Sequence, residues 1–250
     1  MSKIPSPPEN QFDFGFEKVT ASEKTKRVTN VFERVASRYD IMNDVMSLGL
    51  HRIWKHRFVE SVPLRKEGVY LDVASGTGDI AQFLYKRLKS FGMNPSLIAS
   101  DINPAMIEVG QKRYPHLSWL LANAEALPLE DNSVDVYTIA FGLRNVTQRE
   151  KALSEALRVL RPGGKFSCLE FSQVHAPLQT LYDVYSFHII PKMGEWIAQD
   201  KESYQYLSES IRTFPTREAL LELMKEAGFQ RSSYQTYTGG VVALHTGYRL

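Results

Sequence analysis

The 250-residue chain is long enough for one α/β domain, since a domain of this size buries roughly 70 to 75% of the surface that its unfolded chain exposes. Its hydrophobic content of 43% and charged content of 23% are those of an ordinary globular protein. The net charge is only +2, and lysine and arginine are spread along the chain rather than gathered in runs, so we expect no nucleic-acid partner.

Cysteine content and apolar runs exclude further classes of protein. The single cysteine, Cys168, rules out an intramolecular disulfide and a multi-cysteine zinc site; it is expected to be buried in a strand, and we expect no metal. No segment reaches the roughly 18 uninterrupted apolar residues of a membrane span. The N-terminus resembles neither a signal peptide nor a transit peptide. A soluble, cytoplasmic protein is therefore expected.

The N-terminal quarter is predicted to be a loose tail followed by helices. Residues 1–15 contain three prolines and are expected to be flexible. In residues 16–62, apolar residues such as Val28, Val31 and Val35 recur at helical spacing, and no alternating strand pattern is present. We interpret residues 16–62 as a helical N-terminal cap.

Residues 63–250 are predicted to form the main domain, because strand-like and helical stretches alternate there as in a parallel sheet wound with helices on both faces. The expected strands are VYLDVA at 69, SLIAS at 96, LSWLLA at 117, VDVYTIAF at 134 and KFSCLEF at 165. Asn103 and Pro104 are typical of a helix start, and a late helix is expected to stop at Gly228.

The C-terminal stretch YQTYTGGVVALHTGY predicts an antiparallel hairpin, because Gly239 and Gly240 separate two β-rich runs and suit a two-residue turn. The symmetric dinucleotide-binding fold instead repeats parallel units to its end. We therefore expect an α/β, Rossmann-like sheet that is mostly parallel and carries a C-terminal antiparallel hairpin.

The stretch YLDVASGTGDIA, residues 70–81, is a glycine turn between a strand and a helix. Gly76 and Gly78, on either side of Thr77, would let the backbone approach a ligand closely. A pyrophosphate would have to lie on the N-terminus of the following helix, where the carboxylate of Asp79 would oppose it. The turn therefore favours a cofactor without phosphate.

Two later turns fit a nucleoside. Asp101, with Ile102 beside it, ends the second strand and is placed to accept both ribose hydroxyls, although an acid there would also serve the ribose of NAD. The turn Asn123-Ala124-Glu125 suits an adenine edge. Together these features favour S-adenosylmethionine over a nicotinamide dinucleotide; a tight turn without any ligand is the remaining alternative.

The segments LDVASGTGD, ASDIN, NAEALP and VLRPGG resemble the class I S-adenosylmethionine-dependent methyltransferases. The blocks YDIMNDVMSLGLHRIW at 39–54 and RVLRPGGKFSCLEFS at 158–172 resemble the two signatures of the ubiquinone/menaquinone biosynthesis C-methyltransferase family. The resemblance runs from about Phe14 to Leu250. The departures are Ser75 where many members have glycine, Ala140 where some have serine, and Arg161 where lysine is common.

The resemblance implies methylation of a ring carbon of a polyprenyl benzoquinol (2-polyprenyl-6-methoxy-1,4-benzoquinol type) in ubiquinone biosynthesis, and also of demethylmenaquinol. It implies a lipid quinol substrate, other quinone-biosynthesis enzymes as partners, peripheral contact with the inner membrane from the cytoplasmic or mitochondrial matrix side, and a homodimer. Two alternatives stay open: a methyltransferase for another small acceptor, and a catalytically idle scaffold of a quinone-biosynthesis complex.

Within that family reading, Arg144 and Asn145 follow the fourth strand, where methyltransferases of this class place substrate-handling groups. The guanidinium would stabilise a developing phenolate; the alternative is a surface salt bridge. Tyr39 and Asn43 are expected to reach the reacting groups if residues 39–54 close over the cofactor and quinol, whereas the alternative for this block is a solvated helical face.

Two other features are expected to be mainly structural. His51 and His245 are each interpreted as structural residues rather than bases. Apolar residues recur at helical spacing in 178–196, and core or dimer packing is the default interpretation. The alternative for this segment is an apolar lid that receives the polyprenyl tail and touches the bilayer. Within the main domain we assign 173–215 as a substrate lid or insertion.

Overall fold

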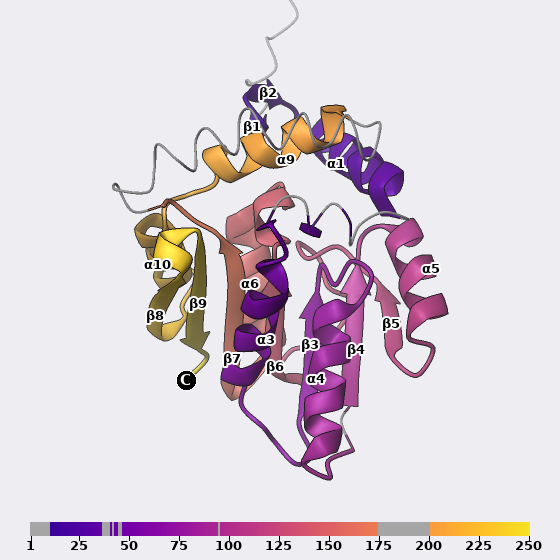
Figure 1. The fold of residues 1–250 in the computed structure, drawn as a ribbon. Coiled ribbons are helices and arrows are strands. Elements are labelled where there is room, and N and C mark those ends of the chain that lie inside the picture. Colours follow the sequence, from indigo (N-terminus) through magenta and orange to yellow (C-terminus); the bar gives the residue numbers. More distant parts are fainter. Residues whose placement is uncertain (1–10, 37–40, 42, 45–46, 95, 175–200) are drawn as a thin grey trace, which may run out of the picture.

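The computed structural model describes residues 11–36, 41, 43–44, 47–94, 96–174 and 201–250 (Figure 1). A seven-stranded sheet forms its centre, in the order β5-β4-β3-β6-β7-β9-β8. The strands are β3 Val69–Val73, β4 Ser96–Asp101, β5 Ser118–Leu121, β6 Val134–Ala140, β7 Leu160–Phe171, β8 Gln230–Tyr237 and β9 Val242–Tyr248. The pairs β5-β4, β4-β3, β3-β6 and β6-β7 are parallel, whereas β9 is antiparallel to both β7 and β8. The predicted fold class is confirmed.

Helices cover both faces of the sheet, because its central strands are apolar on both sides. On one face pack α3 His51–Ser61 and α4 Asp79–Ser90, which contribute Trp54, Phe58, Ile80 and Leu84 to one core cluster. On the other pack α6 Arg149–Val159 and α10 Arg217–Glu226, through Leu153, Ala156, Leu220 and Met224. Cys168 is fully buried in β7, as expected.

A third layer lies across one end of the sheet. The helices α1 Ala21–Val35 and α9 Lys201–Thr213 lie above this end in Figure 1, beside α5 Pro104–Arg113. They share a core cluster that includes Val31 of α1, Met106 of α5 and Leu207 of α9. The N-terminal helix thus covers the strand ends, which is where ligands of open α/β sheets bind.

The N-terminal segment differs from the prediction of a tail followed only by helices. Residues 12–19 form a small antiparallel hairpin, β1 Phe12–Phe14 and β2 Glu17–Val19. Each strand has three residues, too few to show an alternating pattern, and Gly15 makes the turn with a φ of 59°. Phe14 stacks on Tyr206 of α9 at 4.3 Å between ring centroids, which ties the hairpin to the third layer.

The block 39–54 is not one continuous helix. The chain turns at Leu48 and Gly49, both with positive φ (50° and 76°), and α3 begins afresh at His51. His51 and Trp54 are buried, and Trp54 Nε1 donates to Thr238 Oγ1 at 2.8 Å. The alternative of a solvated helical face is therefore wrong for this end of the block.

The C-terminal hairpin has a longer turn than the sequence predicts. Tyr237 pairs with Val242, so the connection has four residues, 238–241, rather than two. It includes the 3₁₀ turn η4 Thr238–Gly240. Thr238 precedes the two glycines with a φ of 51°, and the hydrogen bond from Trp54 holds its hydroxyl. The longer turn is therefore hydrogen-bonded to α3, which is distant in the sequence.

Candidate active site

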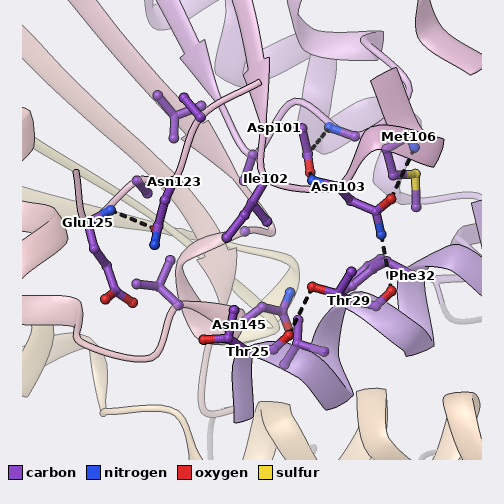
Figure 2. Close-up of a pocket in the computed structure, with 18 of the residues that line it drawn as sticks. Thr25, Thr29, Phe32, Asp101, Ile102, Asn103, Met106, Asn123, Glu125 and Asn145 are labelled. Carbon is purple, nitrogen blue, oxygen red and sulfur yellow. Dashed lines mark hydrogen bonds between the residues drawn. The ribbon is translucent and has the colours of Figure 1, made fainter. Parts of the chain in front are cut away.

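A cavity that is partly open to solvent lies at the carboxyl ends of the strands (Figure 2); together with the open solvent at its mouth, the space within it is about 780 Å³. One side is built by the residues that follow β3, β4, β5 and β6, including the 3₁₀ turn η2 Leu143–Asn145. The other side is α1. Of the predicted cofactor residues, Gly76, Asp101, Ile102, Asn123 and Ala124 all line this cavity. The sheet topology thus brings together residues from three separate turns.

The two glycines of the first turn have different roles. Gly76, with a φ of 58°, lines the cavity and exposes its backbone there. Gly78, with a φ of 91°, is the N-cap of α4 and is not among the residues that line the cavity. A Cβ on Gly78 would lie 2.7 Å from the Trp119 ring, so packing and backbone conformation require glycine there. Of the two glycines, Gly76 alone is among the lining residues, and the role of the turn in cofactor binding stays a prediction.

The Asp101 carboxylate joins two turns at the cavity wall. Its Oδ2 accepts the N–H of Gly76 and its Oδ1 accepts the N–H of Asn103, both at 2.8 Å. Burial raises the pKa of Asp101, and the backbone N–H groups of Asn103, Gly76 and Ile102 oppose that rise. Asn103 in turn caps α5, accepting from Ala105 N at 2.9 Å, with Pro104 in the first turn as the sequence predicts. The acid at the end of β4 is thus held rigidly beside the glycine turn.

The next turn places a second carboxylate at the cavity. Asn123 Oδ1 accepts from Glu125 N at 2.9 Å, which fixes the Asn123 side chain within its own turn. Glu125 Oε1 accepts from Thr147 N and Gln148 N, both at 3.0 Å, and so binds the loop that leads into α6. Among the described residues that line the cavity, Asp101 and Glu125 are acidic and none is lysine or arginine. Such a cavity suits a neutral or cationic ligand better than a pyrophosphate.

The α1 side consists of Thr25, Val28, Thr29 and Phe32, one face of the helix. Three polar contacts hold this face against the sheet side: Thr25 Oγ1 with Thr147 Oγ1 at 3.1 Å, Asn103 Nδ2 with Thr29 O at 3.1 Å, and Lys24 Nζ with Val146 O at 3.2 Å. The sequence predicts that residues 39–54 close the site and does not point to α1 as one of its walls. The signal was present, because its threonines share a face with apolar residues at helical spacing.

Asn145 and Arg144 lie at different depths of the wall. Asn145 lines the cavity, and its Oδ1 accepts the hydroxyl of Tyr206 from α9 at 3.0 Å. The guanidinium of Arg144 is buried behind the wall and pairs with Glu170 at 2.9 Å; it also donates to Phe141 O. The alternative of a surface salt bridge is therefore wrong, and the guanidinium is not among the groups that line the cavity. The sequence points to Arg144 as a site residue but not to Tyr206.

The remaining predicted residues have other places. Thr77 is buried and lines a smaller, neighbouring cavity. Tyr39 and the segment 178–196 lie outside the described residues. Asn43 lines neither cavity. Both histidines sit in structural contacts, His51 with Asp44 Oδ1 and His245 with Arg217 O, each at 2.9 Å.

The part of the chain that the structure describes lacks two other features. No group of three or more His, Cys, Asp or Glu side chains in this part of the chain could hold a metal ion. None of its helices is both long and apolar enough to cross a membrane.

Comparison with known proteins adds the family context. A sequence model of the ubiE/COQ5 methyltransferase family matches residues 19–249. The ubiquinone/menaquinone biosynthesis C-methyltransferase UbiE of Rickettsia bellii (strain RML369-C) is 49% identical over 248 residues, which cover 96% of this chain and 100% of the relative. A mitochondrial 2-methoxy-6-polyprenyl-1,4-benzoquinol methylase of Oryza sativa subsp. japonica is 48% identical over 258 residues, covering 95% of this chain and 88% of the relative.

Solved structures share the fold at low sequence identity. A SAM-dependent methyltransferase from Aquifex aeolicus is 16% identical, with a TM-score of 0.57 over 87% of this chain and 98% of that one. The Haemonchus contortus phosphoethanolamine N-methyltransferase 2, solved with S-adenosyl-L-methionine, is 14% identical, with a TM-score of 0.56 over 75% of this chain and 50% of that one.

Proposed function

The chain belongs to the ubiE/COQ5 methyltransferase family, and from this premise we propose that it transfers a methyl group from S-adenosylmethionine to a ring carbon of a polyprenyl quinol in ubiquinone and menaquinone biosynthesis. The observation that carries the proposal is the cavity at the strand ends, in which Asp101 joins the glycine turn to the next loop and no described lining residue is cationic. That charge pattern matches a sulfonium cofactor.

The cavity fits the adenosyl end of this cofactor. We assign the ribose hydroxyls to Asp101, which ends β4 at the cavity, and Ile102, Met106 and Phe32 offer apolar surface to a flat base. Asn123 and Ala124 form the edge of the same space. The bound cofactor supplies an electrophilic methyl group on a positively charged sulfur. The chain's own task is then to hold donor and acceptor in line, which can supply several kcal/mol of the barrier.

The acceptor needs activation, because a ring carbon is a weak nucleophile until a neighbouring hydroxyl loses its proton. Asn145 is the polar group of η2 on the cavity, and the Tyr206 hydroxyl occupies its carbonyl oxygen. We assign Asn145 to the acceptor oxygen. Arg144 keeps a place in the proposal as a positioning residue, since its bonds to Glu170 and Phe141 O hold η2 against β7.

The finer setting of the enzyme is proposed from the chemistry of the acceptor. A polyprenyl quinol is a membrane lipid, so the protein works at the surface of the inner membrane, on its cytoplasmic side in a bacterium or its matrix side in a mitochondrion. A 2-polyprenyl-6-methoxy-1,4-benzoquinol is the proposed main acceptor, with demethylmenaquinol as a second one. Contact with other enzymes of quinone synthesis and a homodimer belong to the same proposal.

Lipid analysis tests the proposed function. A strain that lacks its own quinol C-methyltransferase is complemented with this chain or with an Asp101→Ala variant. Its quinones are then extracted, and their molecular masses are measured by mass spectrometry. We expect the wild-type chain to restore one methyl group on the quinone ring and the variant to restore much less. A complemented strain that still accumulates the demethylated ring would contradict the proposal, and equal restoration by the variant would remove Asp101 from the site. Turnover by the wild type excludes the idle scaffold.

A further inference from the structure

The side-chain amide of Asn145 is held at both ends. Its Oδ1 accepts the hydroxyl of Tyr206 at 3.0 Å, and its Nδ2 lies 3.5 Å from Phe141 O, which also accepts from Arg144. A carbonyl oxygen can only accept, so the contact with Phe141 places the nitrogen of the amide on that side and its oxygen towards Tyr206. The two contacts therefore select the same one of the two amide orientations.

The hydroxyl of Tyr206 keeps its proton, which suits it to this contact. The residue is only 4% exposed, and burial raises the pKa of its hydroxyl above the ordinary value for tyrosine. The charges of Arg144 and Arg149 act in the opposite direction but are the smaller effect. The hydroxyl therefore has one hydrogen to donate at any working pH, and Asn145 Oδ1 is the acceptor that it reaches.

Tyr206 is itself held by the N-terminal hairpin. Its ring stacks on Phe14 of β1 with 4.3 Å between the ring centroids and 17° between the ring planes. In the turn of the hairpin, the backbone N–H of Phe16 donates to Glu209 Oε2 of α9 at 3.2 Å. Tyr206 is not among the residues that line the large cavity. It therefore reaches the site from behind the wall, through Asn145.

We propose that Tyr206 is a positioning residue, which fixes the end of the Asn145 amide that faces the acceptor. An amide nitrogen carries two hydrogens, so the long contact with Phe141 O leaves at least one of them for the acceptor oxygen. That hydrogen stabilises the negative charge that develops on the oxygen, whereas a flipped amide would present its own oxygen and repel the charge. The inference rests on the proposed function, since it takes Asn145 to contact the acceptor.

The turn η2 then has two supports with different tasks. Glu170 of β7 holds its backbone, because it accepts from Arg144 N at 3.2 Å and from the Arg144 guanidinium at 2.9 Å. Tyr206 of α9 holds the orientation of its amide side chain. The hairpin that carries Phe14 therefore contributes to the reaction through α9, without lining the large cavity itself.

Single-turnover methyl transfer to a short-tailed quinol, measured on the full chain across pH, tests the proposal. We expect Tyr206→Phe to lower the rate constant about tenfold or more, because the Asn145 oxygen, left without a donor against a phenyl ring, turns towards the open cavity. The affinity for S-adenosylhomocysteine, the cofactor without its methyl group, should not change.

The pH dependence adds a readout that packing alone would not alter. The rate of Tyr206→Phe should approach that of the wild type as the pH rises, because the correctly oriented amide lowers the pKa of the acceptor hydroxyl only in the wild type. Tyr204→Phe is the matched control, since it removes the hydroxyl of another buried tyrosine of α9; it should keep the wild-type rate.

A double-mutant cycle decides whether Tyr206 acts through Asn145. In an Asn145→Ala background, Tyr206→Phe should not lower the rate constant further, since the amide that it orients is gone. An equal loss in both backgrounds overturns the proposal, because the hydroxyl would then only support the packing of α9. An unchanged rate in the single variant overturns it as well. A wild-type chain that binds S-adenosylhomocysteine but methylates no quinol overturns the proposed function itself.

Discussion

The sheet side and the α1 side of the large cavity differ in how far apart along the chain their contacts lie. On the sheet side, Asp101 bonds to Gly76, 25 residues away, and to its near neighbour Asn103. On the α1 side, Thr25 meets Thr147 across 122 residues. Consecutive strand-helix units therefore build one side, while the other depends on docking of an N-terminal helix onto the sheet. The two sides can be perturbed separately.

The largest effect is expected behind the sheet side, where the buried ion pair between Arg144 and Glu170 supports the wall. Arg144→Met leaves Glu170, only 1% exposed, as an uncompensated buried charge. Such a loss costs about 3 to 5 kcal/mol of unfolding free energy, which urea denaturation would measure.

The double variant Arg144→Met/Glu170→Leu is the control, since removing both partners of a buried pair is far less costly than removing one. We expect it to recover most of the lost stability. A single variant that is as stable as the wild type but fails to transfer methyl groups would contradict the positioning role and return Arg144 to direct contact with the substrate.

Asp101→Ala sharpens the comparison from the sheet side. It should weaken S-adenosylhomocysteine binding by about 1.5 to 3 kcal/mol, the range for hydrogen bonds to a charged group. It should also lower stability, because the N–H groups of Gly76 and Asn103 lose their acceptor. Calorimetric titration and urea denaturation measure the two effects. The control is Glu108→Ala, since Glu108 is an exposed acid on the neighbouring α5; this variant is expected to change neither the affinity nor the stability. Unaltered affinity in Asp101→Ala would contradict the assignment of Asp101 to the ribose.

Lys24 of α1 makes a pH-dependent contribution to the free energy of unfolding. Burial, with a smaller contribution from Arg149, lowers the pKa of Lys24 from 10.5 to about 8 in the folded chain. Between these two values the unfolded chain binds more protons than the folded one, so stability should rise with pH from about 8 to about 10.5. Urea denaturation at pH 8 and pH 10 measures the rise. It should be smaller in Lys24→Met but unaltered in the exposed control Lys112→Met, and an equal rise in Lys24→Met would count against a buried, docked α1.

The smallest expected effect comes from one hydroxyl pair on the α1 side. Thr25→Val removes the contact to Thr147 Oγ1 and should cost about 0.5 to 1.5 kcal/mol of unfolding free energy. A double-mutant cycle with Thr147→Val isolates the contact from the loss of each hydroxyl. A coupling energy near zero would show that docking of α1 depends on its apolar face alone.

The residues of the sheet side could be predicted because each follows a strand whose apolar run is visible in the sequence. Gly76, Asp101 and Asn123 come at the ends of three such strands, and parallel strands bring their carboxyl ends to one edge. The fold class could be predicted for the same reason. The hairpin β1–β2 could not, because strands of three residues leave no pattern to detect.

The rest of the site depends on contacts between distant segments. Tyr206 reaches Asn145 from 61 residues away. The burial of Arg144 follows from its pairing with Glu170 on the neighbouring strand β7, which spacing along the chain does not reveal. The residues next to them in the sequence do not reveal their partners, which become visible only in the packed structure.

Calorimetric titration of the wild-type chain, with S-adenosylhomocysteine in one experiment and NAD in another, tests most directly that the cavity between the sheet and α1 binds the nucleoside of a methyl donor. Asp101 and Glu125 face this cavity and no cationic side chain among the described residues lines it. We therefore predict saturable binding of S-adenosylhomocysteine and no saturable heat with NAD at millimolar concentration. Tighter binding of NAD than of S-adenosylhomocysteine would contradict the assignment.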